Sequence, residues 1–106
     1  MTPELDVDFF GAVLMCPSCG GRELHHDRVD VFERPEDAAC GVHVSVANNQ
    51  AAFDTAIADN PSPRRHGLVI EFWCEGCEDR SALLIWQHKG STMIDFQILP
   101  PLISGC

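Results

Sequence analysis

The feature that most constrains this chain is a pair of Cys-x-x-Cys motifs that lie far apart in the sequence. The first contains Cys16 and Cys19, and the second contains Cys74 and Cys77. Thiolate sulfur binds Zn²⁺ at about 2.3 Å, and two intervening residues let both sulfurs of one motif reach the same ion. We therefore predict that the four cysteines form one tetrahedral metal site, with zinc as the metal.

Length and composition are typical of a small globular protein. The chain has 106 residues, which predicts one domain over residues 1–106. A chain of this size buries roughly 60–70% of its unfolded surface, so a metal is a useful further source of stability. No apolar run approaches the ~20 residues that cross a bilayer, and residues 1–8 are acidic where a secretory signal is basic. We expect a soluble, cytoplasmic protein without a membrane partner.

Alternation of apolar and polar residues predicts a mainly β fold, with an antiparallel sheet of about five to six strands. In the strand that begins at Leu24 and stops before Pro35, we expect Val29 and Val31 on the inner face. Apolar residues also lead directly into each cysteine motif, as strands that deliver a metal site would. The expected strands cover residues 12–15, 24–33, 41–47, 68–73, 82–88 and 93–98, the last with Ile94, Phe96 and Ile98 inward. Residues 4–10 form either an edge strand or an extended arm.

Residues 48–67 allow two interpretations. Asn48 or Asn49 could cap a short helix over residues 50–58, in which Phe53 and Ile57 lie one helical turn apart. Residues 59–67 contain two prolines and a glycine, a composition typical of a loop. We predict a mobile loop or a short helix here, and no other helix in the chain.

The two motifs and their flanking strands resemble the zinc-ribbon superfamily, whose pattern is Cys-x-x-Cys, a β-hairpin or more, and a second Cys-x-x-Cys. The segment Cys16-Pro17-Ser18-Cys19-Gly20 is closest to the family form. The gap differs, because 54 residues separate Cys19 from Cys74 and ribbons usually have ~15–20. A threefold longer loop costs only about 1 kcal/mol more in closure entropy. Structural zinc in small domains contributes an apparent binding free energy of ~10–16 kcal/mol, which is much larger. The resemblance implies a ribbon in which residues 22–66 add a strand pair and a loop.

Other interpretations of the cysteines stay open. The motifs could be unrelated pairs, a thioredoxin-type redox pair, or ligands of rubredoxin-like iron, although a redox pair usually needs a helix after its first cysteine. Cys40 and Cys106 are isolated, and we expect no role for them. With four thiolates available no histidine is needed as a ligand, so we expect surface or strand-face positions for His25, His26, His43, His66 and His88.

A closed four-cysteine site has no open coordination position, so it cannot activate water or a substrate. No other catalytic motif is present in the sequence, and we do not expect an enzyme. The leading hypothesis is a protein-interaction or regulatory module in which zinc makes a β-sheet surface rigid. An outward-facing Trp73 or Trp86 would then be a binding anchor.

The alternative is a nucleic-acid-binding zinc ribbon of the transcription or translation type. It requires the basic residues to lie together, because phosphate binding depends on concentrated positive charge. The formal charge of −9 makes nucleic acid the less favoured partner. A homodimer also stays open, since strand edges can pair and residues 4–10 could supply an exchanged arm. The basic residues concerned are Arg64, Arg65, His66 and Lys89.

Overall fold

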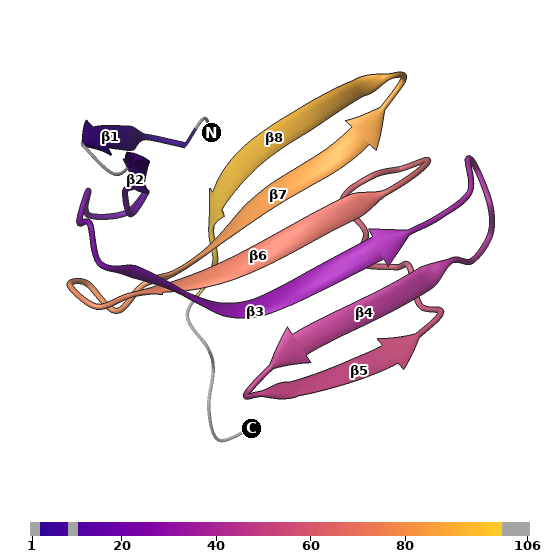
Figure 1. Cartoon of the computed structure of the whole chain (residues 1–106), viewed down its shortest axis with the longest axis horizontal. Coiled ribbons are helices and arrows are strands. Elements are labelled where there is room, and N and C mark those ends of the chain that lie inside the picture. The colour runs from indigo at the N-terminus through magenta and orange to yellow at the C-terminus, as the bar shows by residue number, and fades with distance from the viewer. Residues whose placement is uncertain (1–2, 9–10, 101–106) are drawn as a thin grey trace.

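The computed structural model describes residues 3–8 and 11–100, which contain eight strands and no helix. Two strands form a separate antiparallel hairpin, and six form one antiparallel sheet in the order β5-β4-β3-β6-β7-β8 (Figure 1). The predicted mainly β fold with a six-stranded sheet is confirmed. The strands are β1 Leu5–Asp8, β2 Gly11–Leu14, β3 Leu24–Glu33, β4 Val42–Ala47, β5 Gln50–Asp54, β6 Gly67–Cys74, β7 Arg80–His88 and β8 Ser91–Ile98.

The long segment between the two cysteine motifs extends the sheet sideways. β3 pairs directly with β6, with Leu24 opposite Cys74 at one end and Phe32 opposite Gly67 at the other. The β4–β5 hairpin pairs with the free edge of β3. The added strands therefore lie outside the β3–β6 pair and do not separate the two motifs.

A tight turn, and not a helix, follows β4. Asn48 and Asn49 have φ angles of 52° and 62° and form the two-residue turn between the paired residues Ala47 and Gln50. Left-handed φ at both turn residues matches the twist of hairpin strands, and asparagine tolerates this conformation well. The helix expected over residues 50–58 is therefore wrong for residues 50–54, which form β5. Residues 55–66 contain neither helix nor strand, and their mobility stays a prediction.

The two faces of the sheet have different chemistry. Asp30 and Phe32 lie on one face of β3 and are 9% and 1% exposed, whereas Val31 on the other face is 39% exposed. The predicted inner face of β3, with Val29 and Val31, is thus wrong. The reason is that residues 55–66 approach the Asp30 face, where Asp59 lines the same hollow as Asp30 and Phe32.

Of the three apolar residues predicted to face inward on β8, only one is buried. Phe96 is 1% exposed and packs on Phe72, with ring centroids 5.9 Å apart. Ile94 and Ile98 lie on the same face by alternation but are 49% and 47% exposed. The inward prediction is confirmed for Phe96 alone.

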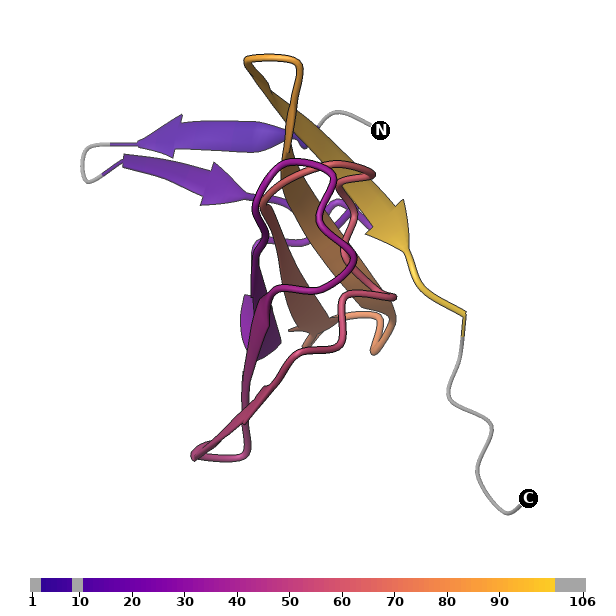
Figure 2. The same ribbon diagram turned by 90° about the vertical axis from the view of Figure 1, so that its right-hand side faces the viewer.

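The β1–β2 hairpin stands apart from the sheet. Figure 2 shows it projecting from one side of the sheet, opposite the loop over residues 55–66. The backbone N–H of Met15 donates to the carbonyl of Glu4 at 2.9 Å, which extends the hairpin toward the first cysteine.

Among the described residues, no helix is long and apolar enough to cross a membrane.

The turn between β4 and β5 gives a direct test of hairpin against helix. Asn49→Gly creates the Asn-Gly pair that this turn type favours, so we expect the free energy of unfolding to rise by up to about 1 kcal/mol. Asn49→Val should lower the free energy of unfolding by about 1–2 kcal/mol, because a β-branched residue is strained at positive φ. Denaturant unfolding measures both. A loss of stability in Asn49→Gly would contradict the turn and would favour a helix cap.

Candidate metal centre

The first motif is a closed turn between β2 and β3. Cys16 is the second residue after the end of β2, and its backbone carbonyl accepts a hydrogen bond from the N–H of Gly20 at 2.9 Å. The N–H of Cys16 in turn donates to the carbonyl of Gly21 at 2.8 Å. Gly20 has a φ of 76°, a left-handed conformation that glycine adopts without strain. The turn therefore points both cysteines to one side.

The second motif repeats this backbone pattern between β6 and β7. Cys74 is the last residue of β6, and its carbonyl accepts from the N–H of Glu78 at 2.9 Å. The N–H of Cys74 donates to the carbonyl of Asp79 at 3.1 Å. Glu78, which corresponds to Gly20 in the first motif, has a φ of 63°. The two motifs are equivalent in hydrogen bonding, with a glutamate in the left-handed position of the second.

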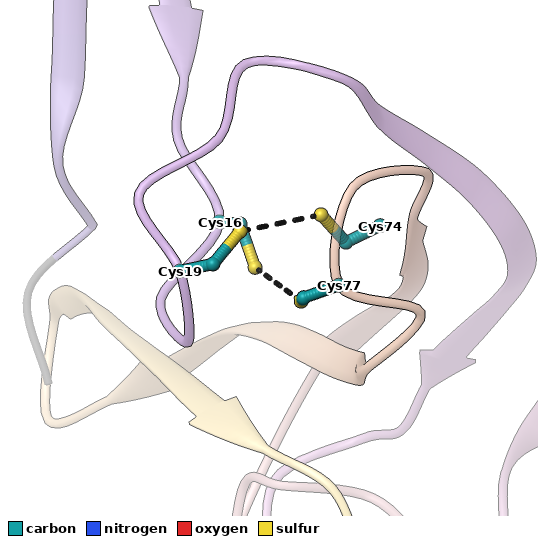
Figure 3. Close-up of side chains that lie close together, drawn as sticks. All are labelled: Cys16, Cys19, Cys74 and Cys77. Carbon is teal, nitrogen blue, oxygen red and sulfur yellow. Dashed lines mark hydrogen bonds between the residues drawn. The ribbon is translucent and has the colours of Figure 1, made fainter.

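The four predicted cysteines come together at one end of the sheet (Figure 3). The sulfur atoms of Cys16 and Cys77 are 3.7 Å apart, and those of Cys19 and Cys74 are 3.6 Å apart. All four sulfurs lie within 4.8 Å of one another. Tetrahedral coordination with bonds of about 2.3 Å places sulfurs roughly 3.8 Å apart, whereas a disulfide needs about 2.05 Å. The cluster is therefore a group of free thiols at metal-binding distance.

Backbone N–H groups stabilise negative charge on the sulfurs. The N–H of Gly21 donates to Cys19 Sγ at 3.3 Å. Hydrogen bonds from the backbone of Cys77 and then Gly76 lower the pKa of Cys74 to about 7, against the opposing effect of burial. A metal ligand must be a thiolate, so the turn prepares Cys74 to give up its proton first.

The sulfurs of Cys19 and Cys77, whose pKa values are raised, keep their protons more strongly when no cation is present. The pKa of Cys77 is raised to about 12, although the backbone N–H of Asp79 lowers it, because burial and the neighbouring thiols outweigh that bond. Several thiolates confined together repel one another. Only a bound cation allows all four to ionise, which is the electrostatic reason that such a cluster suits a metal.

Polar contacts tie the two motifs together around the sulfurs. The hydroxyl of Ser18 donates to the carboxylate of Asp79. The N–H of Glu75 donates to the carbonyl of Glu23 at 3.1 Å, and the Glu75 carboxylate lies 3.1 Å from His25 Nε2. The sequence shows no periodic signal for these contacts, because each joins residues that only the β3–β6 pairing brings together.

Cys40 and the five histidines do not join the cluster. Within residues 3–8 and 11–100, the four cysteines form the only group of three or more metal-ligating side chains. Cys40 is exposed in the connection between β3 and β4, and Cys106 lies outside the described residues. His66 Nδ1 accepts from the N–H of Arg34 at 3.0 Å.

A separate group of charged side chains lies on the face of the sheet that contains Asp30 and Phe32, which we call the polar face. Buried Asp30 accepts hydrogen bonds from Arg28 at 2.9 Å and from His43 at 2.8 Å. The other ring nitrogen of His43 lies 2.9 Å from Asp54, and its ring stacks on Phe32 with centroids 4.5 Å apart. The hydrogen bond to Asp30 raises the pKa of His43, with Asp54 adding to it. The group neutralises a buried carboxylate and links β3, β4 and β5.

Comparison with known proteins gives no relative: no protein-family model, curated protein or solved structure matches the chain. The resemblance to zinc ribbons therefore depends on the two motifs, the equivalent turns that hold them and the cluster of sulfurs. These observations support a metal-ion site formed by the four cysteines.

The left-handed glutamate of the second motif can be tested directly. Glu78→Gly removes the strain that a side chain meets at positive φ, so we expect the metal-bound protein to gain up to about 1 kcal/mol in free energy of unfolding. Glu78→Gln keeps the strain and removes only the charge, so it separates the two effects. Chemical denaturation of all three proteins measures the difference. An equal gain in both variants would contradict the backbone explanation.

Proposed function

We propose that this protein is a small acidic module in which Cys16, Cys19, Cys74 and Cys77 hold one structural zinc ion, and that it acts by binding a protein partner in an interaction or regulatory role. The sulfur separations support zinc, because they are close to the edge length of a tetrahedral thiolate site. Backbone N–H groups directed at Cys19 and Cys74 support it further. Iron in a rubredoxin-like site has the same ligands and is the minor alternative.

The site would serve structure and not catalysis. Four thiolates complete the coordination of zinc, so the ion could neither activate water nor polarise a substrate. Bound zinc would join the β2–β3 connection to the β6–β7 turn and fix the end of the sheet. We accordingly propose no enzymatic activity.

Trp73 carries the proposed interaction role. It precedes Cys74 on β6 and is 39% exposed, whereas Trp86 is half-buried. Its ring lies 6.2 Å from the ring of His25, measured between centroids. An exposed tryptophan on a rigid strand end offers a large apolar surface at little entropic cost, which is typical of binding anchors.

The basic residues do not favour a nucleic-acid partner. Arg64 is bound by two acids, since its guanidinium lies 3.0 Å from both Glu36 and Asp37. Neutralised arginine releases few counterions from a phosphate backbone, and the chain as a whole carries −9. Nucleic acid is therefore the less favoured partner.

Metal analysis of the purified protein tests the zinc site. We expect one zinc ion per chain, loss of most of it in Cys77→Ser, and full retention in Cys40→Ser, which is the matched control outside the cluster. Removal of the metal by a chelator should lower the melting temperature, because metal binding contributes to the folding free energy. Visible absorption would reveal iron. Unchanged metal content in Cys77→Ser would contradict the site.

Capture of partners from the native host tests the Trp73 anchor. Trp73→Ala should reduce co-purified partner about tenfold or more, as expected for a binding hot spot. Met93→Ala is the control, because Met93 is also on the polar face and is 41% exposed. Zinc content and circular dichroism verify that both variants fold. Partner recovery equal to that of the unmodified protein would remove Trp73 as the anchor.

A further inference from the structure

One face of the six-stranded sheet is apolar across its whole width. The strand register aligns one row of six residues, one from each strand from β5 to β8. Cross-strand partners point to the same face, so these side chains form a continuous stripe. The row is Phe53, Val44, Val31, Leu68, Ile85 and Ile94.

A second apolar row lies beside the first. Val46 pairs with Ala51 and Val29, and the row continues through Ile70 and Leu83. It ends at the buried Phe96 on β8. Neither row contains a polar or charged side chain, and Val31, Val46 and Ile94 are 39%, 45% and 49% exposed. Two uninterrupted rows of this kind form a surface that water solvates poorly.

The described residues do not supply a second layer for this surface. A β-sheet with one apolar face is stable when that face packs on another sheet or on helices. Here the described residues contain no helix, and the remaining strands form only the β1–β2 hairpin (Figures 1 and 2). The hairpin projects from the apolar side of the sheet at the metal end, so a covering layer would lie beside it. The radius of gyration is 15.0 Å, against about 13 Å for a compact chain of this length. Within the described residues, the six-stranded sheet is therefore a single layer whose apolar rows stay partly exposed.

We propose that the missing layer is a second copy of this chain, packed face to face as a homodimeric β-sandwich. Six strands about 4.8 Å apart and about 25 Å long present roughly 700 Å², close to the ~800 Å² that each partner buries in a standard stable interface. A two-fold axis lets each copy offer the same surface to the other. Two sheets related in this way pack about 10 Å apart, with their valine and isoleucine side chains interleaved.

The distribution of charge supports a second copy in spite of the acidic chain. Two ion pairs lie on the opposite face: Arg28 binds Asp30 within β3, and Arg80 of β7 binds Glu71 of β6. On the apolar face, Glu33 lies at the exposed end of β3, outside the two rows. Face-to-face packing therefore directs most charges outward, where the solvent screens them.

The dimer does not depend on the proposed role of Trp73. Trp73 pairs with His25 and Arg80 and shares the polar face with Glu71. In the dimer, the Trp73 side chain of each copy would face outward and stay free for a partner. Failure of one proposal leaves the other intact, because the two surfaces lie on opposite sides of the sheet.

Sedimentation velocity of the zinc-loaded full chain, in reducing buffer so that no disulfide links two copies, tests the proposal. We expect a dimer at micromolar concentration. Ile94→Asp should raise the dissociation constant at least 100-fold, because it places a carboxylate in the first row. Met93→Asp is the matched control, since Met93 is the adjacent residue, has similar exposure and points to the other face. It should leave the dimer intact.

Two further variants separate the outcomes. Val46→Asp, in the second row, should also give a monomer, and zinc content and circular dichroism verify that each variant folds. Trp73→Ala should leave the dimer unchanged. A monomeric wild-type chain at 100 μM overturns the proposal, as does a dimer that persists in both Ile94→Asp and Val46→Asp.

Discussion

The antiparallel pairing of β3 with β6 is the interaction on which the metal centre depends. It places Leu24 opposite Cys74, so the turn before β3 and the turn after β6 meet at the same end of the sheet. The contacts between Ser18 and Asp79 and between Glu75 and Glu23 then close the two turns on each other. Because the pairing alone brings the motifs together, the length of chain between them has little influence on the sulfur geometry.

The two faces of the sheet meet the requirements of burial in different ways. On the polar face, Asp30 is buried because Arg28 and His43 satisfy its carboxylate, and the His43 ring also covers Phe32. A buried carboxylate without such partners would cost several kcal/mol. On the apolar face, the two rows of side chains carry no polar group, and several of their members, such as Val31, Val46 and Ile94, stay exposed. The charged groups of the first face are paired within the chain, whereas the second face would be covered by the proposed second copy.

The sequence predicts the parts of this structure in which local chemistry decides the outcome. The cysteine spacing identifies all four members of the cluster, and alternation locates β3, β4, β6, β7 and β8 to within a few residues. At residues 48–58 a weak helical spacing competed with a turn, and the left-handed asparagines decided in favour of the turn. The wrong assignment of the β3 faces has a different origin. Valines usually face a core, but which face is covered depends on where residues 55–66 fold back, and no local pattern records that.

Metal binding and dimerisation would compensate for the same deficiency, which is a small core. Among the described residues, the buried apolar side chains are Phe32, Phe96 and Ala82, together with Cys16 and Cys74 of the cluster. Part of the core is thus the cysteine cluster itself, in which Cys16 and Cys74 are buried and Cys19 is exposed. A ligand that binds only the folded chain adds to its stability by mass action, and so does a partner subunit. Zinc would act at the end of the strands that holds the cysteine cluster, and the second copy would act across the apolar face. Their contributions involve separate contacts and should be nearly additive.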